Sequence, residues 1–185
     1  MRIVAGSARG RRLAAPEGEG TRPTSDKVRA AIFNVLGQFF EGGRVLDLYA
    51  GTGAMALEAL SRGFEEATCV DSSPDAAAVI ARNAGTCGFE ARVTVVRRRV
   101  AEALPGLAPE SFDLAFVDPP YAAGSVESVL SLLSSGRLLD TSAVVIVEHD
   151  RHNIPPERVG VLEMVDRRFY GDTGLSFYRC ERELV

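Results

Sequence analysis

From residue 44 onward, short apolar runs alternate with amphipathic stretches, and this alternation limits the possible folds more than any other feature. The apolar runs are of strand length and typical of strands buried on both faces; they lie at residues 45–48, 67–70, 93–96, 114–117 and 144–147. Helical periodicity fills the intervals between them, at residues 54–62, 74–86, 99–105 and 125–134. Strands that alternate with helices predict a parallel, doubly wound α/β sheet with helices on both faces.

The two ends of the chain extend this sheet. Near the C-terminus, residues 158–168 and 175–182 form two strand patterns joined by a turn, which predicts an antiparallel hairpin and seven strands in all. At the N-terminus, residues 2–6 and 11–15 flank a turn and predict a short β-hairpin arm. A helix is expected over residues 28–39, with Thr24 or Ser25 as N-cap and Gly42-Gly43 as its end. We therefore expect a basic arm over residues 1–23 and one main domain over residues 24–185.

Charge is distributed unevenly along the chain. The net charge of −4 argues at first against a polyanionic partner. Residues 1–30, however, carry seven basic and three acidic side chains, whereas the other 155 residues carry 14 basic and 22 acidic ones. A basic segment on an acidic body fits a surface that positions nucleic acid, although ordinary solvated arginines would look the same.

The composition also excludes several classes of protein. No apolar run approaches the roughly 20 residues that a membrane span needs, and residues 1–15 hold four arginines without an apolar signal core. The cysteines Cys69, Cys87 and Cys180 have neither disulfide-framework nor zinc-site spacing. We expect a cytoplasmic protein that uses no metal and no membrane.

A glycine-rich turn follows the first predicted strand. Between Asp47 and Gly53, glycines let the backbone approach a ligand closely, and the following helix presents free N–H groups. Asp71 ends the second strand, where doubly wound proteins place a carboxylate for ribose hydroxyls. These features predict a nucleoside-bearing cofactor across the carboxyl ends of the first two strands.

Two cofactors fit this turn. Residues 51–56 satisfy G-x-G-x-x-A, and Asp71 lies 20 residues after Gly51, so a dinucleotide is one interpretation. The Asp47 carboxylate, with Tyr49 beside the turn, would repel a pyrophosphate but suits a cofactor that has an ammonium group and no phosphate. The turn therefore favours S-adenosylmethionine, while the dinucleotide stays open on this feature alone.

The fourth predicted strand leads directly into Asp118-Pro119-Pro120-Tyr121. Two prolines remove two N–H donors and fix two φ angles, which leaves rigid acceptors beside a carboxylate. Such an edge can hold an amino group, and Tyr121 offers a ring on which a flat base can stack. The pattern predicts methylation of an exocyclic amine on a nucleobase, achieved mainly by alignment for in-line displacement. A plain proline turn with a solvent-facing aspartate is the alternative.

These two motifs resemble those of class I S-adenosylmethionine-dependent methyltransferases. More narrowly, the chain resembles the RsmD family, which methylates the N2 amino group of one guanine in bacterial 16S ribosomal RNA. The resemblance is nearly full length and includes residues 2–6, 10–13, 22–29, 57–63 and 170–173. It implies a Rossmann-like doubly wound methyltransferase domain, with S-adenosylmethionine as cofactor and 16S rRNA within a small-subunit particle as partner.

The resemblance also implies a role for individual residues. The resemblance implies that the methionine part of the cofactor is surrounded by Asp47, Tyr49, Gly51 and Gly53. It implies that Asp71 holds the ribose, that Ser72 lies beside the adenine, and that Thr24 borders the methyl-donor pocket. Asp118 and the Pro119 carbonyl would orient the target amine, next to Pro120, with Tyr121 against the base. The arginines implied in RNA phosphate contacts are Arg2, Arg9, Arg11, Arg12 and Arg22.

One departure from the family pattern concerns the adenine. Many relatives carry an acidic or amide residue just after the third strand, whereas this chain has Arg97-Arg98-Arg99-Val100. Backbone groups such as those of Val100, or water, would then contact the adenine. The arginine run itself is expected to be a solvated face, and His149, at the end of the fifth strand, is expected to have no role as a base.

Three other functions stay open on the sequence. An adenine-amino methyltransferase on DNA or RNA fits the same motif, because an acceptor edge does not choose between purines. A nicotinamide-dependent oxidoreductase fits the glycine turn. A nucleic-acid-binding module without catalysis fits the basic arm.

Overall fold

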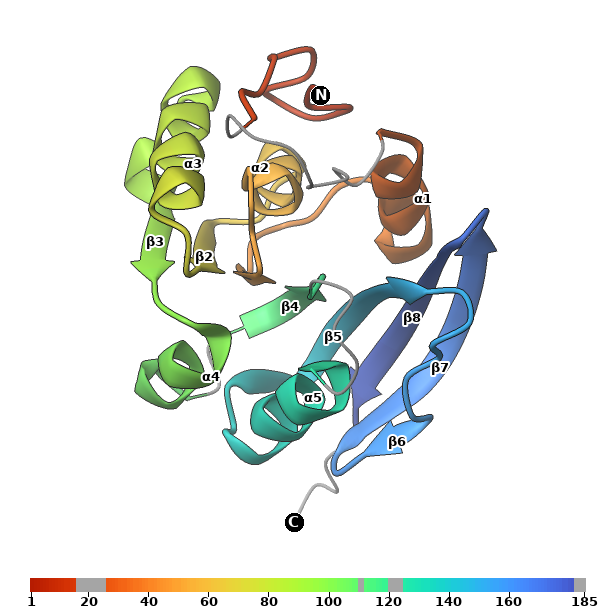
Figure 1. The fold of residues 1–185 in the computed structure, drawn as a ribbon. Coiled ribbons are helices and arrows are strands. Elements are labelled where there is room, and N and C mark those ends of the chain that lie inside the picture. Colours follow the sequence, from red (N-terminus) through yellow and green to blue (C-terminus); the bar gives the residue numbers. More distant parts are fainter. Residues whose placement is uncertain (16–25, 110–111, 120–124, 182–185) are drawn as a thin grey trace.

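The computed structural model describes residues 1–15, 26–109, 112–119 and 125–181 (Figure 1). Within these residues the centre of the molecule is an eight-stranded sheet with the order β3-β2-β1-β4-β5-β8-β7-β6. The strands are β1 (Arg44–Leu48), β2 (Glu66–Asp71), β3 (Val93–Arg97), β4 (Phe112–Val117), β5 (Leu139–Asp150), β6 (Arg158–Val159), β7 (Leu162–Tyr170) and β8 (Thr173–Cys180). The first five are parallel to one another, and β8, β7 and β6 continue the sheet in antiparallel pairing.

In the described residues, one helix precedes β1 and four others connect the parallel strands. They are α1 (Asp26–Leu36), α2 (Ala54–Ser61), α3 (Pro74–Cys87), α4 (Val100–Ala103) and α5 (Ser125–Ser135), with short 3-10 turns at Glu90–Arg92 and Leu104–Gly106. Local sequence explains the bounds of α3: the Ser73 hydroxyl caps it by accepting from the Ala76 N–H, and Gly88 ends it at φ 75°. Helix α2 begins instead at Gly53, in a left-handed conformation and without a side-chain cap.

The helices form one layer on each face of the sheet (Figure 1). Residues of α1, α2 and α3 pack on one face around Phe33, Leu57 and Ile80. Residues of α4 and α5 pack on the other face around Leu104 and Leu130. Since both faces of the central strands β1 and β4 are covered, these strands are buried over nearly their whole length, as expected for the predicted doubly wound arrangement, whereas the outer strand β3 is only partly buried.

Three details of the fold differ from the sequence prediction. The sheet has eight strands rather than seven, because the two-residue strand β6 pairs with the start of β7. Helix α1 ends at Leu36 instead of at Gly42-Gly43, since Gly37 adopts φ 124° and the chain turns so that the Phe40 N–H donates to the Arg62 carbonyl.

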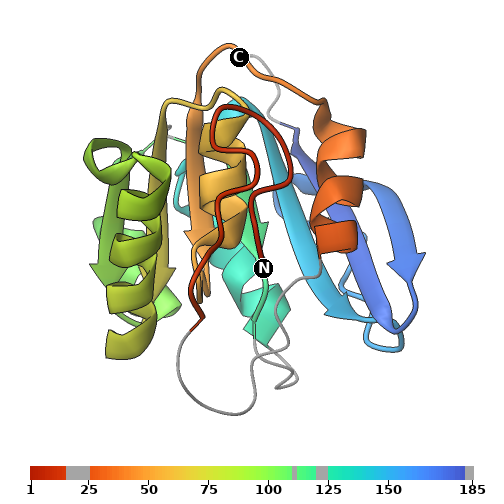
Figure 2. The ribbon, with the colours of Figure 1, turned by 90° about the horizontal axis from the view of Figure 1, so that it is seen from above.

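The third difference is the N-terminal arm, residues 1–15. The arm has one isolated antiparallel bridge, between Arg2 and Arg12, and the N–H groups of Ile3 and Leu13 donate across it to the carbonyls of Arg11 and Met1, so the arm pairs with itself without the two regular strands of the predicted β-hairpin. Other N–H groups of the arm bond to α2: those of Val4 and Ala5 donate to the Glu58 carboxylate at 2.7 and 3.0 Å. The arm therefore lies along α2, with its tip at one end and its two chain ends at the other (Figure 2). The predicted boundary at residues 23 and 24 lies outside the described residues.

No helix in the described part of the chain is long and apolar enough to cross a membrane.

Candidate active site at the carboxyl edge of the sheet

The carboxyl ends of β2, β1 and β4 lie next to one another at one edge of the sheet. Strand β1 is paired with β2 on one side and with β4 on the other, and the chain order reverses between β1 and β4. Ligands of doubly wound sheets bind at this kind of reversal, outside the carboxyl ends of the strands. The sequence-predicted residues Asp47, Asp71 and Asp118 all belong to this edge.

The turn after β1 holds an unusual backbone conformation. Tyr49, Gly51 and Gly53 have positive φ angles of 61°, 54° and 72°. Such an angle is rare for a tyrosine, and rare angles gather at ligand sites, where the surrounding structure holds them in place. The Gly53 N–H donates to the Ala50 carbonyl at 2.7 Å, which closes the turn at the start of α2. The turn thus has the shape that the glycine pattern predicted.

Asp47 is a buried carboxylate beneath this turn. Its side chain is 3% exposed, and its Oδ2 accepts from the Ala56 N–H at 3.1 Å. Burial raises the pKa of Asp47 to about 7, the Ala56 hydrogen bond opposes the shift, and the nearby Asp71 charge adds to it. A cationic ligand group would favour the ionised form of such a carboxylate.

Asp71 links the end of β2 to the glycine turn. Its Oδ2 accepts from the Gly51 N–H at 2.9 Å, and its Oδ1 accepts from the Ser73 N–H at the same distance. The side chain is half-buried, and Ser72 beside it is exposed. The carboxylate is therefore fixed in orientation at the position predicted for a ribose contact.

Asp118 follows the last residue of β4. Its neighbour Val117 is in register with Val147 of β5, one residue before Glu148. The pKa of Asp118 is raised, because surrounding protein atoms disfavour the charged form and because Glu148 and Asp47 add negative charge. Asp118 is nevertheless exposed to solvent.

The residues after Asp118 are described only in part. Pro119 is buried. Pro120 and Tyr121 lie outside the described residues, as do Thr24 and Arg22.

The electrostatics of the edge distinguish the two cofactor classes. The negative charge of Asp47 helps to raise the pKa of Asp118, and the charge of Asp71 helps to raise the pKa of Asp47. A pyrophosphate would add two further negative charges here, whereas an ammonium or sulfonium group would offset those present. The geometry therefore favours a cationic ligand over a dinucleotide.

Val100 stands at the start of α4, directly after the exposed Arg97, Arg98 and Arg99. Its side chain is buried among the residues that pack beneath α4 and α5. Only its backbone is therefore available to a ligand at the edge of the sheet.

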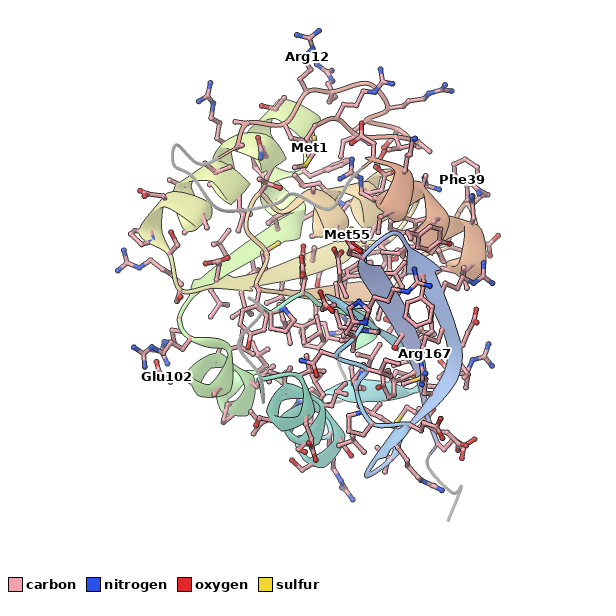
Figure 3. All side chains as sticks on the ribbon, turned by 45° about the vertical axis from the view of Figure 1, so that its right-hand side comes forward. Met1, Arg12, Phe39, Met55, Glu102 and Arg167 are labelled. Atoms are coloured by element: carbon pink, nitrogen blue, oxygen red, sulfur yellow. The ribbon has the colours of Figure 1, made fainter. Side chains whose placement is uncertain are left out.

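The described arginines of the arm lie on the surface. Arg2, Arg9, Arg11 and Arg12 are all exposed, and Figure 3 shows Arg12 pointing away from the body of the protein. Arg2 forms a long contact of 3.9 Å with Asp26. These side chains are placed where an external polyanion can reach them.

Glu58 and two buried arginines fasten the arm, and the sequence interpretation gave them no role. Besides the two arm N–H groups, the fully buried Glu58 pairs with Arg62 at 2.8 Å and with Arg29 at 3.4 Å. Arg29 in turn donates to the Arg2 carbonyl and to Asp26, both at 2.7 Å. The signal in the sequence was the pair Glu58 and Arg62, four residues apart on an otherwise apolar helix.

Asn83 is a second residue that sequence reasoning missed. It is fully buried in α3, where its Oδ1 accepts from the Ala14 N–H at 2.8 Å. Its Nδ2 donates to the carbonyls of Ala14 and Thr52, at 3.0 and 2.9 Å. One side chain thus joins the arm to the glycine turn. An asparagine among the apolar positions of α3 was the available signal.

His149, at the end of β5, lies in the core. It is 6% exposed, with its two ring nitrogens 2.8 Å from the Asp150 carbonyl and 2.9 Å from the Ser176 hydroxyl. Burial lowers the pKa of His149. Gly174 makes room for the ring, because a Cβ there would lie 2.3 Å from Cε1 of His149.

Across residues 1–15, 26–109, 112–119 and 125–181, no cluster of three or more His, Cys, Asp or Glu side chains is arranged to hold a metal ion.

Comparisons with known proteins agree with this geometry. The model of the family described as "Conserved hypothetical protein 95" matches residues 1–179. YlbH of Bacillus subtilis is 40% identical over 97% of this chain and 98% of its own length. "Ribosomal RNA small subunit methyltransferase D" of Escherichia coli is 35% identical over 99% of this chain and 91% of its own length. The solved structure of YhhF from Escherichia coli matches with a TM-score of 0.82 and 30% identity, covering 99% of each chain. The chain therefore belongs to the conserved hypothetical protein 95 family, the RsmD and YlbH family of rRNA methyltransferases.

Proposed function

We propose that this protein transfers a methyl group from S-adenosylmethionine to the exocyclic N2 amino group of a guanine in 16S small-subunit rRNA. The observation that carries the proposal is the position of Asp47 and Asp118 at the carboxyl ends of the adjacent strands β1 and β4. The Asp47 carboxylate suits a cationic methyl donor, and the Asp118 carboxylate suits the amine that receives the methyl group. The family membership supplies the rRNA substrate class.

On the donor side, the chain offers groups for each part of S-adenosylmethionine. Asp47, with Tyr49 and the two glycines of the turn, would hold the methionine part, whose ammonium offsets the buried charge. Asp71 would accept from the ribose hydroxyls, and Ser72 and the Val100 backbone would border the adenine. Thr24 is proposed at the border of this pocket on the family resemblance alone. When bound, the cofactor supplies an electrophilic methyl on a sulfonium.

On the acceptor side, Asp118 and the Pro119 carbonyl would accept hydrogens from the target amine and direct its lone pair at the methyl carbon. In the step, the N–C bond forms, the C–S bond breaks, and its electron pair stays on sulfur. The amine then loses a proton to Asp118 or to water. The raised pKa of Asp118 suits this acceptance. Pro120 and Tyr121 are proposed to keep the acceptor edge rigid and to stack on the base.

On the RNA side, Arg2, Arg9, Arg11 and Arg12 would contact phosphates, because they are exposed along the arm. Arg22 is added on the resemblance alone. Phosphate contacts position an RNA without selecting its sequence, so the choice of guanine rests on the acceptor edge and on the fit of the base.

The test is nucleoside mass spectrometry on small ribosomal subunits from cells that lack this protein. We expect N2-methylguanosine to be missing there and to appear after incubation with the purified protein and S-adenosylmethionine. The matched control is Asp113→Asn, at the opposite end of β4, where Asp113 accepts from the Arg44 N–H at 2.7 Å; it should retain activity. Appearance of N6-methyladenosine instead would support the adenine alternative, and unmethylated RNA would overturn the proposal.

A further inference from the structure

The far end of α2 forms a groove that the proposed reaction does not use. The tip of the arm, the segment of Phe39 and Phe40, and the end of α2 enclose a hollow of about 610 Å³. Helix α2 runs from Ala54 at the glycine turn to Ser61 at the groove. At 1.5 Å per residue, the groove lies roughly 12 Å along the helix from the proposed active site.

The walls of this groove are tightly fitted. A Cβ at Gly6 would lie 1.8 Å from the Ser61 carbonyl oxygen, and one at Gly63 would lie 2.0 Å from that of Phe40. The Ser7 N–H donates to the Ser61 carbonyl at 2.8 Å. The arm and the loop after α1 are therefore fixed against α2, and the groove is a preorganised surface.

One wall carries an aromatic ring that is open to solvent. Phe40 packs on Phe64, with ring centroids 4.5 Å apart, while Phe39 is 70% exposed. Phe39 is the most exposed of the large apolar side chains in the described residues, and Figure 3 shows it projecting from the surface. A ring held outward on a fixed segment can stack on a nucleobase.

The charged residues of the lining are all basic. Arg9 is exposed at the tip of the arm, and the half-buried Arg92 donates to the Phe64 and Glu65 carbonyls. Arg62 also lines the groove, but Glu58 pairs with it. All of the lining residues are described ones, and none of them is acidic. The tip continues the row of exposed arginines along the arm.

We propose that this groove binds an unpaired nucleotide of the rRNA substrate, with its base on Phe39 and its phosphate between Arg9 and Arg92. The inference rests on the proposed function, because it takes rRNA as the substrate. Because the groove lies apart from the acceptor edge, the nucleotide bound there would not be the methylated guanine itself. It would be another nucleotide of the same RNA. Proteins bind single-stranded RNA with exposed aromatic rings that lie beside cationic side chains and away from carboxylates.

The first experiment measures binding to small ribosomal subunits from cells that lack the protein, with S-adenosylhomocysteine present. We expect Phe39→Ala to weaken binding about tenfold or more and Phe39→Trp to retain it, because stacking needs a flat ring. Arg9→Ala should lower the slope of log affinity against log salt by about one. The controls are Val165→Ala, on an apolar residue of β7 that is 52% exposed, and Arg137→Ala, beyond α5; both should bind as the wild type does.

The second experiment places a photo-crosslinking benzoylphenylalanine at position 39. Crosslinks to 16S rRNA support the inference, whereas crosslinks only to a ribosomal protein overturn it. Binding by Phe39→Ala equal to that of a wild type that methylates the same particles would also overturn it. If the proposed function were wrong, the wild type itself would leave the particles unmethylated, which distinguishes that failure from a failure of this inference. Unchanged S-adenosylhomocysteine affinity in all variants shows that the donor pocket is intact.

Discussion

Replacing Asp47 by asparagine tests two effects of the buried carboxylate. One is the loss of folding stability in the protein without ligand, and the other is the gain in ligand affinity. Asparagine has nearly the same shape, and its carbonyl oxygen can still accept from the Ala56 N–H. The substitution removes the ionisable group alone. We expect the variant to be more stable than the wild type at neutral and higher pH, and to bind S-adenosylhomocysteine weakly.

The magnitude follows from the pKa of Asp47, which folding raises from 3.8 to about 7. Between these two values the folded state holds a proton that the unfolded state has lost, so the free energy of unfolding falls as the pH rises. At 1.36 kcal/mol per pH unit, the full cost approaches about 4 kcal/mol above pH 7. Roughly 2 to 3 kcal/mol of this develops between about pH 5 and about pH 8.

The assay is urea unfolding of both proteins at about pH 5 and about pH 8. The difference in the free energy of unfolding between Asp47→Asn and the wild type should increase by about 2 to 3 kcal/mol from the lower to the higher pH. Any cost of the amide that does not depend on pH cancels in this comparison. Asp75→Asn, at an exposed position in the first turn of α3, is the control and should show no such growth. An equal gain at both pH values, or a loss at the higher one, would refute the reasoning.

The other predictions concern the acceptor edge, the arm and the packing of His149. Replacing Asp118 by alanine should lower methyl transfer by about 100-fold or more, because alignment of the amine is lost, while calorimetry detects S-adenosylhomocysteine affinity within a few fold of the wild type. Replacing both Arg11 and Arg12 by alanine should reduce the salt slope of RNA binding by about two, since each phosphate contact releases counterions. Replacing Gly174 by alanine should lower the free energy of unfolding by about 1 to 3 kcal/mol, measured in urea, because the new Cβ would overlap the His149 ring.

Each of these predictions has an outcome that contradicts it. Unchanged turnover after the loss of Asp118 would remove that residue from the reaction. An unaltered salt slope would mean that the two arm arginines leave phosphates untouched. For Gly174, the control is Gly106→Ala, where nothing lies within 4 Å of the added Cβ; equal effects at both glycines would show that the His149 contact is unimportant.

The parallel part of the fold was predictable because its signals are local. Every parallel strand was expected inside its observed bounds, since a strand buried on both faces has an apolar run that needs no partner to be recognised. The glycine turn was equally legible, because positive φ angles at Gly51 and Gly53 demand particular residues. The end of α1 was wrong by three residues, because Phe39 continues the apolar period although Gly37 has already ended the helix.

The arm and its fastening could not be predicted, because they depend on contacts between distant parts of the chain. The Val4 N–H and the Glu58 carboxylate are 54 residues apart, and no local pattern pairs them. The pattern around the turn predicted a regular hairpin, whereas the arm divides its N–H donors between its own carbonyls and α2. The candidate site divides in the same way: Asp47, Asp71 and Asp118 end predicted strands, whereas the role of Asn83 emerges only when α3 packs beside the turn.

Asn83 has a consequence for how the two proposed ligands influence each other. Its amide spans Ala14 of the arm and Thr52 of the glycine turn, so neither segment can shift without disturbing a bond to the other. We therefore expect an RNA that orders the arm to tighten the binding of the methyl donor, and thermodynamic reciprocity would make the factor identical in both directions. Removing this amide should weaken that coupling, although Glu58 would still hold the arm on α2.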